Sequence, residues 1–340
     1  MGVMIAEGWR QYVDRNELGY GWPLYAYTVS GTVFADVSGR RTLDMNGARL
    51  ARALTPRRRV CAHFIVDLTA GTIGSTTVLF DFGLNPVGIN AAAYNSANQS
   101  RFSIRAYGPK IQVIRRAFGP NGEVQSNTQT VADVAHGMIA GNSYRIEVMV
   151  DVSGEAGTCE VMMNGALLGE WSFSRAISSY ACDADFGSIY LGGDATSGCR
   201  GRVSNLVIYD DAAPTAWPAG PLNISYLNSQ PNAGESFSWP PAAADVPVSV
   251  DGAGKSWNLA DTSGISAGSI RGVIGTVRLS TPDALTPAKP KVSWVSGGAT
   301  LKEDLLTVQP GAPYFDHQTV IPAATPAALD ALVLDIRPWS

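Results

Sequence analysis

The chain has 340 residues, of which 45% are hydrophobic and 16% charged, with 36 glycines, 20 prolines and a net charge of −4. This length allows one large domain or two medium ones with well-filled cores. Few charges and many turn-forming residues favour a β-rich fold over a helical bundle. A weakly acidic chain without a stripe of basic and aromatic residues is not expected to bind nucleic acid.

The first ten residues lack the basic region and the apolar core of a secretory signal, so synthesis and folding in the cytoplasm are expected. No apolar run approaches the roughly 18 residues that a membrane-spanning helix requires. We therefore expect no membrane insertion.

Alternating apolar and polar residues, separated by turns at intervals of roughly 8 to 15 residues, predict strands throughout the first part of the chain. The predicted strands are residues 24–29, 42–45, 48–53, 60–68, 77–83, 88–93, 102–106, 111–116, 144–151, 159–163, 166–173, 187–192 and 202–209. Short strands at this spacing are typical of a two-sheet sandwich.

The most regular pattern lies between residues 143 and 211. Residues 143–151 alternate, a glycine-rich turn follows at 152–157, and residues 159–163 end in an Asn164-Gly165 corner. An Asn-Gly pair between alternating segments is a strong hairpin signal. Together with residues 203–209, these segments predict three strands of one antiparallel sheet.

Residues 213–221 break the strand pattern with three prolines, which cannot join a central strand. They predict a connector between a sandwich domain, residues 1–212, and a smaller β-sandwich-like domain, residues 222–340. In the second domain, strands are expected at residues 223–227, 271–280, 291–295, 305–308 and 331–336. Before the last strand, Thr325 as N-cap and Pro326 at the first helical position predict one helical turn.

The histidines do not form a catalytic pattern. His63 lies in an apolar strand, whereas His136 and His317 lie in stretches that read as loops. We interpret all three as ordinary packed or surface side chains, and we assign no catalytic residue. The zinc-hydrolase pattern H-E-x-x-H is absent.

The four cysteines lack the C-x-x-C spacing of zinc sites and thioredoxin-type motifs. Cys61 and Cys159 fall inside predicted strands and are expected to be small buried side chains. Cys182 and Cys199 flank a strand, so a disulfide between them stays open, although the cysteine frequency suits a reducing cytosol.

Acidic residues offer two alternatives. A sandwich glycosidase needs two carboxyl groups about 5 to 10 Å apart, and only Asp183 and Asp185 have a fitting spacing, in a polar loop. A calcium ion needs hard oxygen ligands, for which Asp194, Asp210 and Asp211 are the candidates. Both groups of residues are also ordinary loop and turn formers. No other cofactor is indicated.

Two further sets of residues have a binding and a structural interpretation. Trp217 and Trp239, each next to a proline, could stack on a sugar or seal the joint between the domains, whereas Trp171 and Trp294 are expected in cores. The run Arg57-Arg58-Arg59 could clamp a phosphate, but a solvated turn before the next strand is the favoured interpretation.

Four segments form a further pattern: Tyr144-Arg-Ile-Glu-Val148, Glu160-Val-Met-Met-Asn-Gly165, Ile189-Tyr-Leu-Gly-Gly193 and Gly201-Arg-Val-Ser-Asn-Leu-Val-Ile-Tyr209. Together they resemble concanavalin A-like, laminin-G-type jelly rolls. The resemblance implies an all-β chain with a concanavalin A-like sandwich followed by a smaller β domain. The acidic pattern of laminin-G calcium sites is not matched, so those ligands are not transferred.

A second layout comprises Glu7-Gly8-Trp9, Ser38-Gly39-Arg40, residues 60–68 and Phe237-Ser-Trp-Pro240. It is similar to structural proteins of tailed bacteriophages that carry such a sandwich, although the acidic connecting stretch usual in those proteins is reduced here. The resemblance implies a non-enzymatic virion protein assembled in the host cytoplasm. It would be a tail fibre or adhesin that contacts other virion proteins and a host-surface glycan or receptor.

Appendages of this kind are built as cyclic homo-oligomers, so the resemblance also implies an oligomer such as a trimer. Three alternatives stay open: a capsid decoration or head-fibre protein, a carbohydrate-binding lectin-like module, and a sandwich glycosidase.

Overall fold

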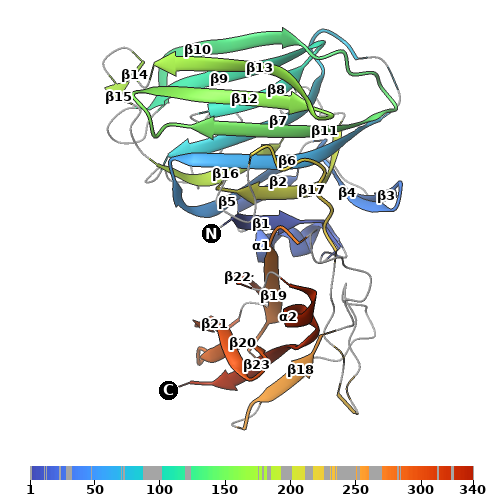
Figure 1. Ribbon diagram of the computed structural model, residues 1–340, viewed down its shortest axis with the longest axis vertical. Coiled ribbons are helices and arrows are strands. Elements are labelled where there is room, and N and C mark those ends of the chain that lie inside the picture. Colours follow the sequence, from blue (N-terminus) through green and yellow to red (C-terminus); the bar gives the residue numbers. More distant parts are fainter. Residues whose placement is uncertain are drawn as a thin grey trace. The chain divides into compact units, whose positions relative to one another are not determined.

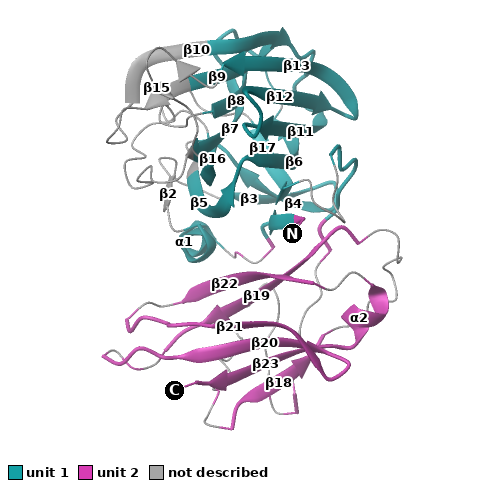
Figure 2. Ribbon diagram, turned by 60° about the vertical axis from the view of Figure 1, so that its left-hand side comes forward, with its two compact units in different colours: residues 1, 3–9, 14–223 teal, residues 2, 10–13, 224–340 magenta. Residues whose placement is uncertain are grey.

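The computed structural model describes residues 2–10, 12, 14–22, 24–27, 33–46, 48–69, 71, 73–86, 102–118, 124–174, 176–177, 180–181, 185–192, 201–210, 217–225, 230, 232–233, 235, 250, 253–259, 270–281, 283, 285–311, 314–322 and 325–339. By internal contacts the chain divides into two compact units (Figure 2). Unit 1 comprises residues 1, 3–9 and 14–223, and unit 2 comprises residues 2, 10–13 and 224–340. The predicted strand at 88–93 and the cysteines at 182 and 199 lie outside the described residues.

Unit 1 is a sandwich of two antiparallel sheets, whose strands cross the upper part of Figure 1. The first, the β6 sheet, has the order β13 (Ala166–Ser174), β12 (Ala156–Met163), β11 (Ser143–Asp151), β6 (Arg59–Leu68), β17 (Gly201–Tyr209), β4 (Arg40–Asp44) and β3 (Phe34–Val37), with β1 (Val3–Glu7) also paired to β17. The second, the β7 sheet, has the order β10 (Val124–Ala135), β9 (Lys110–Phe118), β8 (Phe102–Tyr107), β7 (Val78–Pro86), β16 (Phe186–Gly192), β5 (Ala48–Arg57) and β2 (Leu24–Tyr27).

The remaining elements of unit 1 are short: η1 (Arg15–Glu17), α1 (Leu18–Gly21) and the paired strands β14 (Ala176–Ile177) and β15 (Tyr180–Ala181). The predicted hairpin is confirmed, since Asn164 and Gly165 both have positive φ between β12 and β13. The segments 143–151, 159–163 and 203–209 lie in β11, β12 and β17 of one antiparallel sheet, as predicted.

Aromatic side chains from both sheets fill the core of the sandwich. The ring of Phe64 on β6 lies 5.2 Å from that of Phe80 and 6.0 Å from that of Phe82, both on β7. Phe102 on β8 meets Phe173 on β13 at 5.0 Å. These contacts identify which side of each strand faces inward, because alternate residues of a strand face opposite sides of its sheet.

Unit 2 has a four-stranded sheet of order β18 (Lys255–Asn258), β23 (Leu332–Pro338), β20 (Pro290–Ser296) and β21 (Ala299–Leu305), and a pair formed by β19 (Val273–Leu279) and β22 (Phe315–Ile321). Residues from both sheets and from the following helix form its core: Trp257, Val277, Val292, Trp294, Ile321, Leu329, Leu332, Leu334 and Ile336. The predicted helical turn is α2 (Pro326–Asp330), where the Thr325 side chain accepts a hydrogen bond from the Ala328 amide.

The fold-class prediction is confirmed in that the chain is all-β, with a sandwich of two antiparallel sheets followed by a smaller β unit. Some local predictions are wrong. No strand spans residues 305–308, where one was predicted: β21 ends at Leu305, and Val308 forms only an isolated bridge with Ala288. Residues 223–225 are not in a strand, and His317 lies inside β22 rather than in a loop. Among the described residues, no helix has the length and apolarity needed to cross a membrane.

Candidate functional site

A row of polar side chains crosses the outer face of the β7 sheet. Because Phe80 and Phe82 point into the core, the intervening and following alternate residues Asp81, Gly83 and Asn85 face outward. The strand registers extend this row across β9, β8, β7 and β16. We call it the polar row: Asp81, Asn85, Ser103, Arg105, Gln112, Ser188 and Tyr190.

Hydrogen bonds between neighbouring strands hold several of these side chains in place. The Ser103 hydroxyl donates to Asp81 Oδ1 at 2.5 Å, and Arg105 Nε donates to Gln112 Oε1 at 2.9 Å. The Arg105 guanidinium also lies 4.8 Å from the centroid of the Tyr107 ring. Side chains held in this way keep one geometry on the face of the sheet.

Asn85 is the least satisfied member of the polar row. Its Nδ2 donates to the Ser188 hydroxyl at 3.2 Å, and the residue is fully buried. Within the described part of the chain, its Oδ1 is shielded from solvent and has no hydrogen-bond partner. A buried acceptor left unpaired costs about 1–3 kcal/mol, so stability alone does not explain an asparagine here.

Burial decreases along the polar row. Asn85, Ser103, Ser188 and Tyr190 are buried although they face away from the core, whereas Arg105, Tyr107 and Gln112 are half-buried. The open end of the row therefore lies over β8 and β9. Carboxylate, carboxamide, hydroxyl and guanidinium groups beside one aromatic ring can hydrogen-bond to a hydroxyl-rich ligand and pack against its apolar face.

A second polar cluster lies on the outer face of the β6 sheet, under residues 217–223, which we call the strap. Trp217 Nε1 donates to Glu160 Oε2 at 2.9 Å, and the Gly220 amide donates to Glu147 Oε2 at 3.1 Å. The Leu222 amide donates to His63 Nε2 at 3.3 Å.

Asn205 anchors the end of the strap. Its Nδ2 donates to the Leu222 carbonyl at 3.4 Å and to Asn223 Oδ1 at 3.3 Å. Asn205 has a φ of 49° at an irregularity of β17, between Ser204 and Val207. This bulge presents the Asn205 carbonyl to His63 Nδ1, 3.2 Å away.

Burial controls the charges under the strap. Desolvation lowers the pKa of His63 to about 4, with nearby Arg145 adding to the effect, and raises the pKa of Glu147. His63 is therefore neutral near pH 7, with its proton on Nδ1 and its Nε2 free to accept from Leu222. Glu147 is paired with Arg145, whose Nε lies 3.1 Å from Glu147 Oε1.

The predicted glycan and calcium residues are not brought together in the described structure. Trp217 is half-buried in the strap, and Trp239 lies outside the described residues. Asp210 is bound by Arg57 Nε at 2.9 Å, whereas Asp194 and Asp211 lie outside the described residues. Among the described residues, no group of three or more His, Cys, Asp or Glu side chains could hold a metal ion. Calcium stays a prediction.

Each arginine of the run 57–59 forms an ion pair. Arg57 pairs with Asp210, Arg58 with Asp185 at 3.1 Å, and Arg59 with Asp151 at 3.8 Å. These carboxylates come from different parts of unit 1, so the arginines link its elements.

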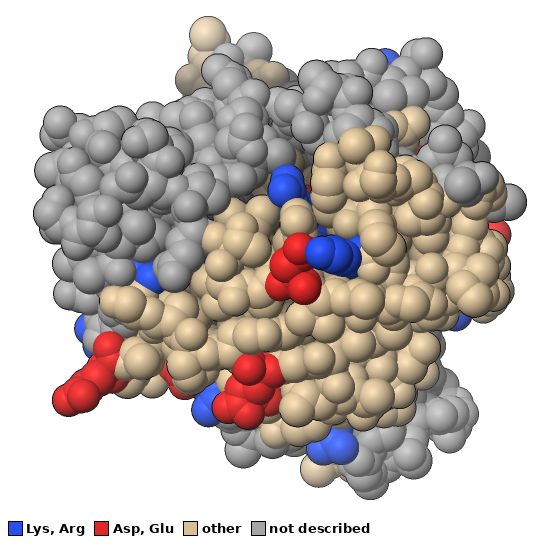
Figure 3. All heavy atoms as spheres, turned by 90° about the horizontal axis from the view of Figure 1, so that it is seen from above, with Lys and Arg blue, Asp and Glu red and all other residues tan. Residues whose placement is uncertain are grey.

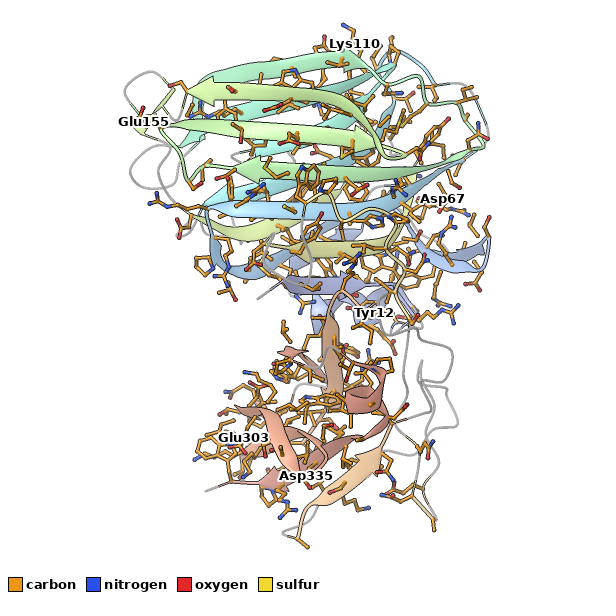
Figure 4. The ribbon with its side chains drawn as sticks, viewed as in Figure 1. Tyr12, Asp67, Lys110, Glu155, Glu303 and Asp335 are labelled. Carbon is orange, nitrogen blue, oxygen red and sulfur yellow. The ribbon has the colours of Figure 1, made fainter. Side chains whose placement is uncertain are left out.

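Elsewhere, Lys110 projects from the surface (Figure 4) and pairs with Asp133 at 2.7 Å. On the face seen in Figure 3, the described charged side chains are few and of both signs.

Cysteine and tryptophan predictions have mixed outcomes. Cys61 and Cys159 are buried, as predicted, and burial raises the pKa of the Cys159 thiol. Trp294 is buried in the core of unit 2, as predicted. Trp171 is half-buried rather than a core residue, because β13 is an edge strand of its sheet.

The histidines are packed side chains, as the sequence suggested. His136 is buried, with Nε2 2.9 Å from the Gly108 carbonyl, and its Nδ1 accepts from the Met138 amide. His317 Nε2 lies 3.0 Å from Asp304 Oδ2.

The carboxylate pair proposed for a glycosidase is not formed in the described residues, where Asp185 pairs with Arg58 and Asp183 is not described. The sequence Gly264-Ile-Ser-Ala-Gly268 has the spacing of a hydrolase nucleophile elbow and also lies outside the described residues.

The polar row was missed by sequence reasoning, because its polar residues look like the solvated face of any amphipathic strand.

Neither any protein-family model nor any curated protein matches the chain. Three solved structures illustrate the similarity of its fold. The carbohydrate recognition domain of Emp46p, in its metal-free form, is 10% identical over 60% of this chain and 94% of its own, with a TM-score of 0.40. A carbohydrate esterase from the Shiga toxin-encoding bacteriophage phi24B is 9% identical over 56% and 89%, with a TM-score of 0.34.

The third is a sialidase from Trypanosoma rangeli, 14% identical over 53% of this chain, with a TM-score of 0.32. The chain spans only 26% of the length of that sialidase. At such identities and TM-scores we assign no function from these proteins, and the strand pairings themselves define the fold.

Proposed function

We propose that the chain is a non-enzymatic binding protein that recognises a hydroxyl-rich ligand, a glycan, through the polar row of the β7 sheet. The observation that carries this proposal is the buried Asn85 Oδ1, which has no partner within the described residues. A ligand can approach the row at its open end, where Arg105 and Gln112 lie half-buried beside Tyr107, and a ligand hydroxyl that also reached the shielded Asn85 oxygen would satisfy it.

Two further features support a glycan over other ligands. The polar row combines acceptors and donors with the Tyr107 ring beside them, which suits sugars that present both hydroxyls and an apolar ring face. Among its described residues, the row contains a single carboxylate, Asp81, whereas sandwich glycosidases use two. Binding without hydrolysis is therefore the proposed activity.

The direct test is a glycan array probed with the full chain, followed by titration calorimetry of each hit. Arg105→Met should weaken binding at least about tenfold, since hydrogen bonds to charged groups contribute about 1.5–3 kcal/mol. Arg58→Met is the matched control, because Arg58 is half exposed and pairs with Asp185 away from the row. Absence of any glycan hit, or equal affinity in both variants, would contradict the proposed site. Recovery of the glycan unchanged would support binding without turnover.

A place in a tailed-phage virion is a second proposal, and the sequence layout of residues 7–9, 38–40, 60–68 and 237–240 supports it. A tail fibre or adhesin, a capsid decoration and a homo-oligomer such as a trimer are its specific forms. Cryo-electron microscopy of intact particles would distinguish them. Density at the tail supports adhesion, density on the capsid lattice supports decoration, and absence from particles would leave the glycan-binding role alone.

A further inference from the structure

The strap crosses four adjacent strands of the β6 sheet in the order in which they pair. Trp217 reaches β12, Gly220 reaches β11, Leu222 reaches β6, and the Leu222 carbonyl with Asn223 reaches β17. Strands lie about 4.8 Å apart, and two extended residues span about 6.6 Å, so about two residues per strand suffice for the crossing.

The chemistry of this contact is unusual, because uncharged donors meet ionisable acceptors. Residues 217–223 contain no ionisable side chain, and they bind through two backbone amides and an indole N–H. Each of these three donors points at a group that accepts only in its deprotonated form or accepts best in it: Glu160, Glu147 and His63. Protonation of His63 therefore acts directly on the attachment, because its Nε2 is the acceptor of the Leu222 amide.

Gly220 fixes the geometry of the central contact. Its φ of 73° lies in the left-handed region that favours glycine, and a Cβ there would meet nothing within 4 Å. The requirement is therefore conformational: the backbone must turn to present its amide to Glu147.

We propose that residues 217–223 form an acid-released strap, docked on the β6 sheet at neutral pH and detached when His63 takes up a proton. Protonation of His63 places a hydrogen on Nε2, where the Leu222 amide now donates, so that two donors face each other. Glu147 is not a trigger, because burial raises its pKa and it takes up its proton more readily under the docked strap. Release would free up to about 25 Å of extended chain directly before Ile224, the residue at which unit 2 resumes.

Few charged groups face His63 from the surrounding elements. On β11 they are Arg145, which opposes its protonation, and Glu147, which lies opposite His63 in the register. On β6 itself, Cys61 lies two residues away, and Asp67 lies four residues away and is paired with Arg40 at 2.9 Å. The described β17 residues opposite His63 contribute the Asn205 carbonyl, and Glu160 lies beyond on β12.

The size of the effect follows from linkage. A histidine with a pKa of 6.5 when exposed and about 4 under the strap binds its proton more tightly in the detached state. Docking is therefore strongest above pH 6.5 and weakens as pH falls towards 4. If the whole depression comes from the docked strap, detachment becomes about 30-fold more favourable by pH 5 and about 160-fold by pH 4.

Hydrogen exchange of individual amides in the full chain, corrected for the intrinsic effect of pH, tests this directly. The protection of the Gly220 and Leu222 amides should fall at least tenfold between pH 7.5 and 5. The reference is the Val152 amide of the same unit, which donates to the Arg58 carbonyl at 2.9 Å, an acceptor that does not titrate, and it should change less than threefold. Equal changes at all three amides, or none, would overturn the proposal.

Variants separate His63 from other titrating groups. In the double variant His63→Gln with Glu147→Gln, both side chains still offer an oxygen acceptor but no longer titrate, so the strap amides should lose their pH dependence. His136→Gln removes the other buried histidine of unit 1 and should leave the pH dependence of the strap amides unchanged. If the double variant does not fold, the midpoint of strap release in the native chain must coincide with the imidazole titration of His63 rather than of His136. A midpoint of strap release that coincides with the titration of His136 would refute the proposal.

Discussion

Asn85 provides the sharpest test of why the polar row exists, because its substitution separates stability from binding. In Asn85→Ala the unpaired Oδ1 disappears, which should restore about 1–3 kcal/mol. The bond from Nδ2 to Ser188 is lost at about 1 kcal/mol, and the small cavity left behind costs roughly another 1 kcal/mol. The free energy of unfolding should therefore stay within about 1 kcal/mol of the native value.

Chemical denaturation, followed by circular dichroism, measures this change. Thr42→Val is the matched control, since Thr42 is also fully buried but its hydroxyl donates to the Ala35 carbonyl at 2.9 Å. That variant should lose about 1–2 kcal/mol. A loss of more than about 2 kcal/mol in Asn85→Ala would show that Asn85 supports the fold, and the reasoning from its unpaired oxygen would then be refuted.

Three further predictions concern unit 1. Phe64→Ala should lower the free energy of unfolding by about 3–5 kcal/mol in urea denaturation, because its ring joins the two sheets through Phe80 and Phe82, and a loss below 1 kcal/mol would contradict that packing. A thiol reagent should label Cys61 and Cys159 only after unfolding, as peptide mass spectrometry would show, and rapid labelling of either of these two cysteines in the native chain would contradict their burial. Burial lowers the pKa of both His63 and His136, so stability should be highest above pH 6.5 and fall as pH decreases towards 4. His63 should contribute at most about 3 kcal/mol to this fall. If stability measured by urea denaturation rises on acidification, this sign is wrong.

The sequence predicted the parts of the fold where local signals are strong. Asn164-Gly165 and the alternation around it identified the hairpin, and Thr325 before Pro326 identified α2. It missed β1, whose five residues are too few for a clear period, and β10, a polar edge strand with little alternation. The connector pattern was visible, but not that residues 217–223 bind the β6 sheet, because backbone donors leave no mark in the side-chain sequence.

The candidate site was hidden for a related reason. Asp81 and Asn85 alternate with core phenylalanines, and this pattern predicts the strand but not whether its outer face is solvated or buried. Only the register, which places Ser188 beside Asn85 and Arg105 beside Asp81, brings the polar side chains together across strands that are distant in the sequence.

The central claim is that a glycan binds on the outer face of the β7 sheet, and amide chemical-shift mapping with a glycan hit tests it most directly. The amides of residues 81–85, 103–105 and 188–190 should move on titration with one shared dissociation constant, while those of β11 and β12 in the other sheet stay in place. Shifts confined to the β6 sheet or to unit 2 would contradict the assignment.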